Sequence, residues 1–471
     1  MKSEDIMRSM NYLDEKHIEN AEKLRNKKPE KRRKLWVKIV AAAACVSLVI
    51  TGIALFPGNK PTAYAIAEAK YPKQVKCPTD PEGDQDEYEA YSDSVTAKRR
   101  LAEKHSGEGD GFWKAAVSEL LGSGEGNKVC SPINIYFALS VLAETADGES
   151  RKQILSLVGA ENIEALRESA NELWQAEYKD DSSGKCLFAN SLWLSDSVKF
   201  KKQTLDLIAE NYYASSFSGK MTDSGFNKRR QSWVNEQTGG LLGDAVKEMN
   251  FSSETVMSLI STVNFRAKWQ NEFDSADTYE EVFHGADSDA RCDFMHKTEY
   301  LMPYYWGESF SAVPMQLSES GTMWLILPDE GTTPENLVSS GVIAEMISGS
   351  EYKNRAQSVV NLSVPKFDVT SDLDLSDKLQ KLGVTDVFDF DKADFSPLTG
   401  EKGGVALGGA EHSARVTADE KGVTAAAFTK FDYSGASAPD RTVDFKLDRP
   451  FIFIITGKGT MPLFVGIVNA V

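Results

Sequence analysis

The residues best suited to a chemical role lie in one segment about fifty residues before the C-terminus. That role is to be a site of peptide-bond cleavage. Residues 420–429 read Glu-Lys-Gly-Val-Thr-Ala-Ala-Ala-Phe-Thr, and residues 435–439 read Gly-Ala-Ser-Ala-Pro. The second stretch is small and turn-prone, which is typical of an exposed tip that a protease can cut. An ordinary edge hairpin is the alternative interpretation of the same residues.

From residue 423 the segment alternates between two faces, as a strand does. Side chains on a strand point alternately to opposite sides, so one face could enter a core while the other stays in water. The pattern predicts a loop that can become a strand. The inward face would carry Val423, Ala425, Ala427, Thr429, Phe431 and Tyr433, and the outward face Thr424, Ala426, Phe428, Lys430, Asp432 and Ser434.

The sequence contains no motif of enzyme chemistry: it lacks Gly-x-Ser-x-Gly, His-Glu-x-x-His, a phosphate-binding loop and a calcium-binding loop. Its five histidines are isolated, and an isolated histidine more often forms a structural hydrogen bond than it catalyses. Its five cysteines show no Cys-x-x-Cys pair, so neither a zinc site nor a disulfide framework is indicated, although a pairing of Cys77 stays open. We expect no catalysis, no metal and no cofactor.

Composition predicts a large globular domain that does not bind nucleic acid. The chain has 471 residues, 41% of them hydrophobic and 26% charged, enough for one large core or two smaller ones. Its net charge is −17, and because residues 1–38 carry +5, the remainder carries −22. Binding to phosphates needs clustered cations, so this acidic body argues against a nucleic-acid partner.

Short motifs surround residues 420–429 in a recognisable order. Those downstream are Arg-Pro-Phe (449–451) and Pro-Leu-Phe-Val-Gly (462–466). Those upstream are Asn-Lys-Val-Cys-Ser-Pro (127–132), Leu-Phe-Ala-Asn-Ser-Leu-Trp (187–193), Trp-Val-Asn-Glu-Gln-Thr-Gly-Gly (233–240), Phe-Arg-Ala-Lys-Trp (265–269), Leu-Pro-Asp-Glu (327–330), Pro-Lys-Phe (365–367) and Asp-Phe-Ser (394–396). The whole succession resembles the serpins, the serine-protease inhibitor family.

This resemblance implies an α+β serpin fold for residues 109–471. The family has a large central, mostly antiparallel β-sheet with further sheets, about eight or nine helices and an exposed reactive-centre loop. We expect a monomer of bacterial origin.

The resemblance also assigns a hinge, where the loop would enter the sheet. Inward positions of a hinge must be small or apolar, because a buried unpaired charge costs several kcal/mol. Val423 stands where the family usually has Thr or Ser, and an apolar side chain meets the same demand. The hinge residues are Glu420, Gly422, Val423, Thr424, Ala425, Ala426 and Ala427.

Family spacing places the reactive bond between Ala436 and Ser437. Ala436 lies sixteen positions after Glu420 and fourteen before Pro450, and both spacings are those of the family. A small apolar residue before the cleaved bond suits serine proteases of elastase-like or subtilisin-like specificity. Tyr433 is a less favoured site for a chymotrypsin-type enzyme.

The resemblance places His412 under the central sheet, near the point where the loop inserts, in a group called the shutter. The other members are Ser131, Asn134 and Ser261. The family usually has Ser at the second of these positions and Asn at the third. The amide and the hydroxyl are exchanged here, which can preserve donor and acceptor capacity.

The function implied is inhibition of serine proteases by conformational trapping. The loop is offered as a substrate, the protease forms an acyl-enzyme, and the cleaved loop inserts into the central sheet before the ester is hydrolysed. Stored strain drives this switch. Two alternatives remain: a non-inhibitory serpin-fold binding module, and a membrane-anchored sensor of external proteolysis.

The N-terminal region predicts a membrane anchor. Residues 39–56 are uncharged and apolar, and with the residues before them they give a spanning segment over 35–56. The basic run at 31–34 places residues 1–34 in the cytoplasm and the C-terminal domain outside, as in a single-pass protein of the cell membrane. A cleaved signal peptide is the alternative, and it would make the protein secreted. Residues 57–108, with several prolines, are interpreted as an extracytoplasmic linker.

Overall fold

The computed structural model describes residues 64–78, 84–240, 250–318, 321–348, 352–423, 441–459 and 461–471. They belong to one compact unit that runs from Tyr64 to Val471. The expected cytoplasmic segment (1–34) and spanning segment (35–56) lie outside the described residues.

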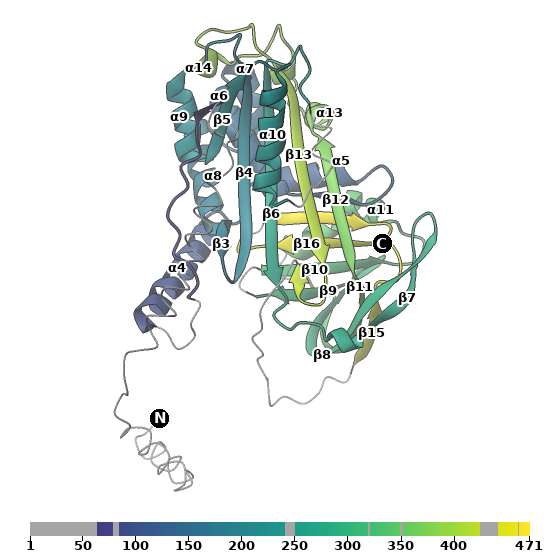
Figure 1. The fold of residues 1–471 in the computed structure, drawn as a ribbon. Helices are drawn as coiled ribbons and strands as arrows, with labels where there is room; N and C mark the ends of the chain where they lie inside the picture. Colours follow the sequence, from purple (N-terminus) through teal and green to yellow (C-terminus); the bar gives the residue numbers. More distant parts are fainter. Residues whose placement is uncertain are drawn as a thin grey trace, which may run out of the picture. The chain divides into compact units, whose positions relative to one another are not determined.

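The first sheet carries the hinge, and its strands run in the order β1-β5-β4-β6-β13-β12 (Figure 1). Two short strands lie off this path, with β14 on β6 and β3 on β4. Most neighbours are antiparallel, but β4 with β5 and β6 with β13 are parallel. The bounds are β1 Ala65–Ala67, β3 Lys179–Asp181, β4 Gly184–Ser195, β5 Ala214–Gly219, β6 Met257–Lys268, β12 Phe367–Asp374, β13 Leu407–Ala418 and β14 Gly422–Val423.

The second sheet runs β15-β11-β8-β9-β10-β16-β17-β2, with β7 paired to β8. Its pairs are antiparallel except that of β11 with β15. The described chain thus has two mixed sheets, in agreement with the expected α+β fold. The bounds are β2 Lys128–Cys130, β7 Thr278–His284, β8 Asp289–Trp306, β9 Phe310–Leu317, β10 Gly321–Pro328, β11 Arg355–Pro365, β15 Thr442–Lys446, β16 Phe451–Thr456 and β17 Pro462–Val468.

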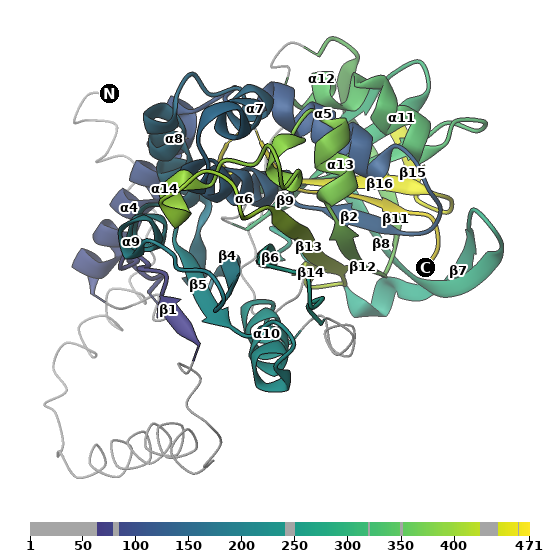
Figure 2. The same cartoon turned by 90° about the horizontal axis from the view of Figure 1, so that it is seen from above.

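Helices cover both faces of the first sheet. Figure 2 shows α10 on one face of β4, β6 and β13, and α5, α6, α7 and α8 on the other. The described residues form eleven α-helices, more than the eight or nine expected, partly because α4 precedes the region where the domain was expected to begin. The bounds are α4 Gln85–Lys104, α5 Asp110–Leu121, α6 Pro132–Thr145, α7 Gly148–Val158, α8 Ile163–Glu177, α9 Lys202–Asn211, α10 Ser224–Gln237, α11 Pro334–Ser340, α12 Val342–Ser348, α13 Ser376–Lys381 and α14 Ser396–Thr399.

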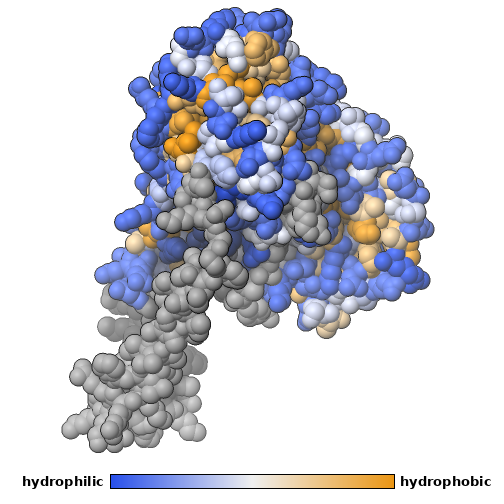
Figure 3. Space-filling view, turned by 45° about the horizontal axis from the view of Figure 1, so that its top comes forward, coloured by the Kyte–Doolittle hydropathy of each residue, from blue (hydrophilic) through white to orange (hydrophobic). Residues whose placement is uncertain are grey.

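The central helix α6 explains how the shutter residues reach the sheet. Every residue of α6 is buried, and most of its residues are apolar, as is typical of a helix enclosed by a core. Ser131 precedes the helix in an extended conformation, and proline at the first helical position fixes the start. Outside this core, the face shown in Figure 3 is largely hydrophilic with limited hydrophobic patches.

The folded unit begins earlier than the expected boundary at residue 109. Strand β1 pairs antiparallel with β5 at the edge of the first sheet, and α4 packs beside α8. Between them, the ring of Tyr71 stacks on Trp174 and Tyr178, at centroid distances of 5.6 and 5.8 Å. From Tyr64 onward, the described part of the expected linker (57–108) is therefore part of the fold.

No helix among the described residues is long and apolar enough to cross a membrane. The segment expected to do so, 35–56, is not among them.

Candidate functional site

The candidate site is an opening in the first sheet between β6 and β13. These parallel strands are paired from Leu407 with Met257 as far as Ser413 with Thr262. Beyond that point β6 continues to Lys268 and β13 continues to Ala418. In the described sheet these continuations are not paired with each other. Two parallel strands can be joined into an antiparallel sheet by one strand that runs between them in the opposite direction.

The hinge starts such a strand at the far end of the opening. β14 runs antiparallel to β6, with Gly422 opposite Lys268 and Val423 opposite Ala267. Val423 is only 1% exposed, so it is buried at the entrance. The hinge residues Thr424, Ala425, Ala426 and Ala427 and the reactive bond Ala436–Ser437 lie outside the described residues, so their placement stays a prediction.

A tight turn connects β13 to β14. The carboxylate of Asp419 accepts hydrogen bonds from the backbone N–H groups of Lys421 and Gly422, at 2.9 and 3.2 Å. The indole N–H of Trp269 donates to the carbonyl oxygen of Asp419 at 2.8 Å. The turn is thereby fixed to the end of β6.

Gly422 is required by both its conformation and its surroundings. Its φ is +147°, in the region that favours glycine. A Cβ there would lie 2.3 Å from the carbonyl oxygen of Ala267, and that backbone belongs to β6. Only glycine allows the hinge to approach the strand this closely.

Glu420 ties the turn to Lys366, between β11 and β12, and to Phe273, in the segment after β6. Its carboxylate forms an ion pair with Lys366 at 2.7 Å, and its carbonyl oxygen accepts the N–H of Phe273 at 2.9 Å. Burial opposes ionisation of Glu420, but the ion pair with Lys366 outweighs it, so the pKa of Glu420 lies below its ordinary value. Glu420 is therefore ionised at neutral pH.

The four shutter residues meet at the closed end of the opening, and all are buried. The backbone N–H of Ser131 donates to Nε2 of His412 at 2.9 Å. On the other side of the ring, Nδ1 of His412 lies 3.5 Å from the hydroxyl of Ser261. The amide of Asn134 donates to the carbonyl oxygen of Thr262 at 2.8 Å, and the hydroxyl of Ser261 is 3.5 Å from the carbonyl oxygen of Asn134.

These contacts link α6, β6 and β13 at the last paired residues before the strands part. Because Nε2 of His412 accepts a hydrogen bond, its proton is on Nδ1, facing Ser261. Complete burial lowers the pKa of His412 to about 3, so the ring is neutral at physiological pH.

Sequence reasoning did not identify several residues that hold the site. Trp269 and Lys366 lie in motifs, but nothing in the sequence places either beside residues 419 and 420. Asn190 on β4 donates to the side-chain oxygen of Asn134 at 3.5 Å, which extends the shutter network to a third strand. The only sequence feature that pointed to Asn190 was its place in the motif at 187–193.

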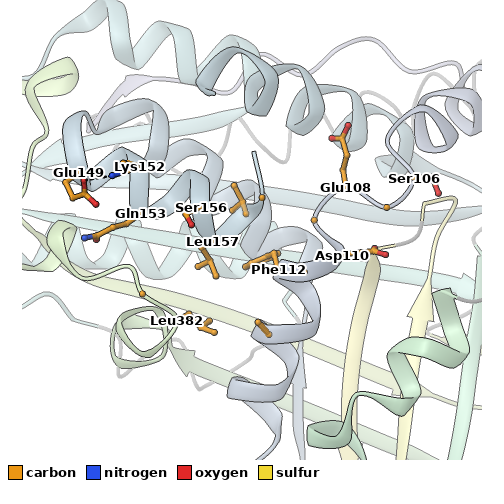
Figure 4. Close-up of a pocket in the computed structure, with 17 residues that line it drawn as sticks. Ser106, Glu108, Asp110, Phe112, Glu149, Lys152, Gln153, Ser156, Leu157 and Leu382 are labelled. Carbon is orange, nitrogen blue, oxygen red and sulfur yellow. Dashed lines mark hydrogen bonds and ion pairs between the residues drawn. The ribbon is translucent and has the colours of Figure 1, made fainter. Parts of the chain in front are cut away.

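A cavity among the described residues lies away from the opening. It measures about 960 Å³, and its lining residues include Phe112, Leu157, Leu382, Glu149 and Lys152 (Figure 4). None of its lining residues belongs to the hinge or the shutter.

In the described ranges there is no group of three or more His, Cys, Asp or Glu side chains that could hold a metal ion. Among the described residues, Cys130, Cys186 and Cys292 are free thiols.

Comparisons with known proteins agree with this geometry. The model of the family "Serpin (serine protease inhibitor)" matches residues 115–471. Alpha-1-antiproteinase 2 of Equus caballus is 30% identical over 347 residues, which are 71% of this chain and 79% of the relative. The protein therefore belongs to the serpin family, whose members are in general protease inhibitors and not enzymes.

Other relatives and solved structures widen the comparison. A serine protease inhibitor of Cyanea capillata is 27% identical over 361 residues, covering 74% of this chain and 93% of the relative. The native thermophilic serpin tengpin superposes with a TM-score of 0.70 at 25% identity, over 87% of this chain and 100% of tengpin. Thyroxine-binding globulin in complex with thyroxine gives a TM-score of 0.66 at 22% identity, over 77% and 98%. The two curated relatives are animal proteins and give no support to the expected bacterial origin.

Proposed function

We propose that this protein is a suicide-substrate inhibitor of serine proteases. The protease serine attacks the carbonyl carbon of Ala436, the bond to the nitrogen of Ser437 breaks, and Ser437 leaves as a free amine while Ala436 stays esterified to the enzyme. The freed loop then inserts between β6 and β13 before the ester is hydrolysed. The observation that carries this proposal is the β6–β13 opening, with an antiparallel strand already started at its entrance.

The register of β14 supports insertion of the residues that follow. If the pairing of Val423 with Ala267 continues, Ala425 comes opposite Phe265 and Ala427 opposite Val263. Phe265 and Val263 are both buried, so their partners on the same face must be small or apolar. The sequence supplies alanine at both places.

The specificity that we propose is for proteases with small primary pockets, of the elastase-like or subtilisin-like kind. The residue that would enter the pocket is Ala436, which trypsin-like enzymes do not favour because they select a cation. The fold alone also suits non-inhibitory serpins, since thyroxine-binding globulin shares it. The apolar hinge favours the inhibitor over a binding module or a sensor of proteolysis.

We further propose that the serpin domain is a monomer held outside the cell by residues 35–56, with 1–34 in the cytoplasm, or secreted if the N-terminal segment is cleaved. Because the folded unit starts at Tyr64, the spacer between membrane and domain shortens to residues 57–63. Protease digestion of intact cells checks this: loss of the domain with protection of residues 1–34 supports the anchor.

The proposed function is tested by incubating the full-length chain with subtilisin and with pancreatic elastase. We expect a band at the summed mass that survives denaturing electrophoresis, and cleavage after Ala436. Trypsin is the matched control and should give no such band. Cleavage while every protease stays active would overturn the inhibitory function.

A further inference from the structure

Helix α10 is fastened to only one side of the opening by its apolar side chains. Figure 1 shows the helix lying along the sheet between β4 and β13. Phe226, Trp233 and Val234 of α10 pack in a separate hydrophobic cluster with residues of β4, β5 and β6, and no residue of β12 or β13 belongs to this cluster. The strands beneath this apolar face lie on the β6 side of the opening.

One side chain of α10 reaches across to the other side. Arg230 is 1% exposed, and its guanidinium donates to both carboxylate oxygens of Glu411 on β13. The same guanidinium lies over the ring of Phe251, 4.3 Å from its centroid. Glu411 is aligned with Ile260 of β6, just before the last paired residues, so the ion pair spans the line along which the strands must part.

We propose that the Arg230–Glu411 pair is a latch that slows the separation of β13 from β6 and so sets the rate of loop insertion. This inference rests on the proposed function, because it assigns a positioning role to two residues in that same movement. Arg230 and Glu411 do not touch the protease or the reacting bond.

The physical reason is the width of a strand. A new strand between β6 and β13 moves them apart by about 4.8 Å, the spacing of neighbouring strands. Either the ion pair then breaks, or α10 moves with β13 and loses its apolar packing against β4 and β6. The first route is costly because a buried arginine without its counter-ion is strongly unfavourable. The second is costly because it exposes the apolar side chains of α10 to water.

The test measures insertion without any protease. A synthetic peptide with the sequence of residues 423–436 is added to the intact full-length chain, and its annealing rate is followed on native gels. Glu411→Gln removes the charge that Arg230 binds, and we expect annealing to be at least about tenfold faster, because 1.4 kcal/mol off the barrier is a factor of ten. In the double variant Arg230→Met with Glu411→Gln, the rate should stay within about twofold of the single variant, since coupled residues are non-additive.

Asp368→Asn is the matched control. Asp368 forms an ion pair with Arg415, which joins β12 to β13 on one side of the opening. This variant should lower the denaturant midpoint without a change in annealing rate. Equal annealing rates in Glu411→Gln and the wild type would overturn the latch and leave the proposed function standing. No annealing in any variant would overturn both.

Discussion

At the scale of single residues, His412 shows how the closed end of the opening depends on a neutral ring. Its Nε2 must accept the N–H of Ser131, and protonation would replace this acceptor with a second donor. The pKa of about 3 follows from burial, which disfavours the imidazolium ion.

A pH dependence of stability follows from this shift. The folded pKa of about 3 lies below the ordinary histidine value of about 6.5, so between these values the unfolded chain binds a proton that the native state does not. This contribution is complete above pH 6.5 and is lost as the pH falls, by about 2 kcal/mol between pH 7 and pH 5. Denaturant unfolding at both values measures it. His412→Gln should show a smaller loss, and an identical loss in both proteins would contradict the assignment.

Gly422 gives a second prediction at this scale. Gly422→Ala places a methyl group against the backbone of β6 and forces alanine into a glycine conformation, so we expect β14 to detach and the free energy of unfolding to fall by about 2–4 kcal/mol. Gly331→Ala is the control, because Gly331 also has positive φ but nothing within 4 Å of the position that the methyl group would take, and should cost only about 1 kcal/mol. Similar losses in denaturant melts of both variants would show that the close approach to β6 does not matter.

At the scale of elements, the alternation of hinge residues between an inward and an outward face can be tested by placing the same charge on either face. Ala425→Glu would put a charge opposite Phe265 on the buried face, whereas Ala426→Glu would put the same charge on the outward face. We expect the first variant to be cleaved as a substrate with at least about tenfold less stable protease complex, and the second to inhibit nearly as the wild type does. Densitometry of the complex and cleaved bands measures the partition. Equal partition in the two variants would exclude insertion in the proposed register.

The sequence indicated the features that depend on short motifs and neighbouring residues. The motifs at 127–132, 187–193 and 265–269 placed the α+β fold, and the small or apolar residues from 423 onward predicted a hinge; of these hinge residues the structure describes only Val423. What the sequence did not predict depends on contacts between distant residues. The strand β1 is three residues long and gains its partner β5 only about 150 residues later, and Arg230 meets Glu411 across 181 residues. Polar residues carry little periodic signal, so α4 was interpreted as linker.

At the scale of the whole molecule, trapping by insertion requires a native state that is not the most stable arrangement of the chain. The open stretch of β6 and β13 leaves backbone groups that an inserted strand would pair on both edges. Each hydrogen bond contributes a net of about 0.5–1.5 kcal/mol, so about a dozen would stabilise the inserted form by on the order of 10 kcal/mol. The intact loop prevents this gain because its two ends are held at β14 and β15.

The most direct measurement is the thermal unfolding of the full-length chain before and after one cut between residues 424 and 440, with the cut verified by intact mass. The cleaved chain should insert its loop and unfold about 10 °C or more above the intact chain, since each kcal/mol raises the midpoint by about 1 °C in a domain of this size. Circular dichroism follows both transitions. A cleaved chain that unfolds at the same temperature or below would show that no strand enters the sheet, and would contradict trapping by insertion.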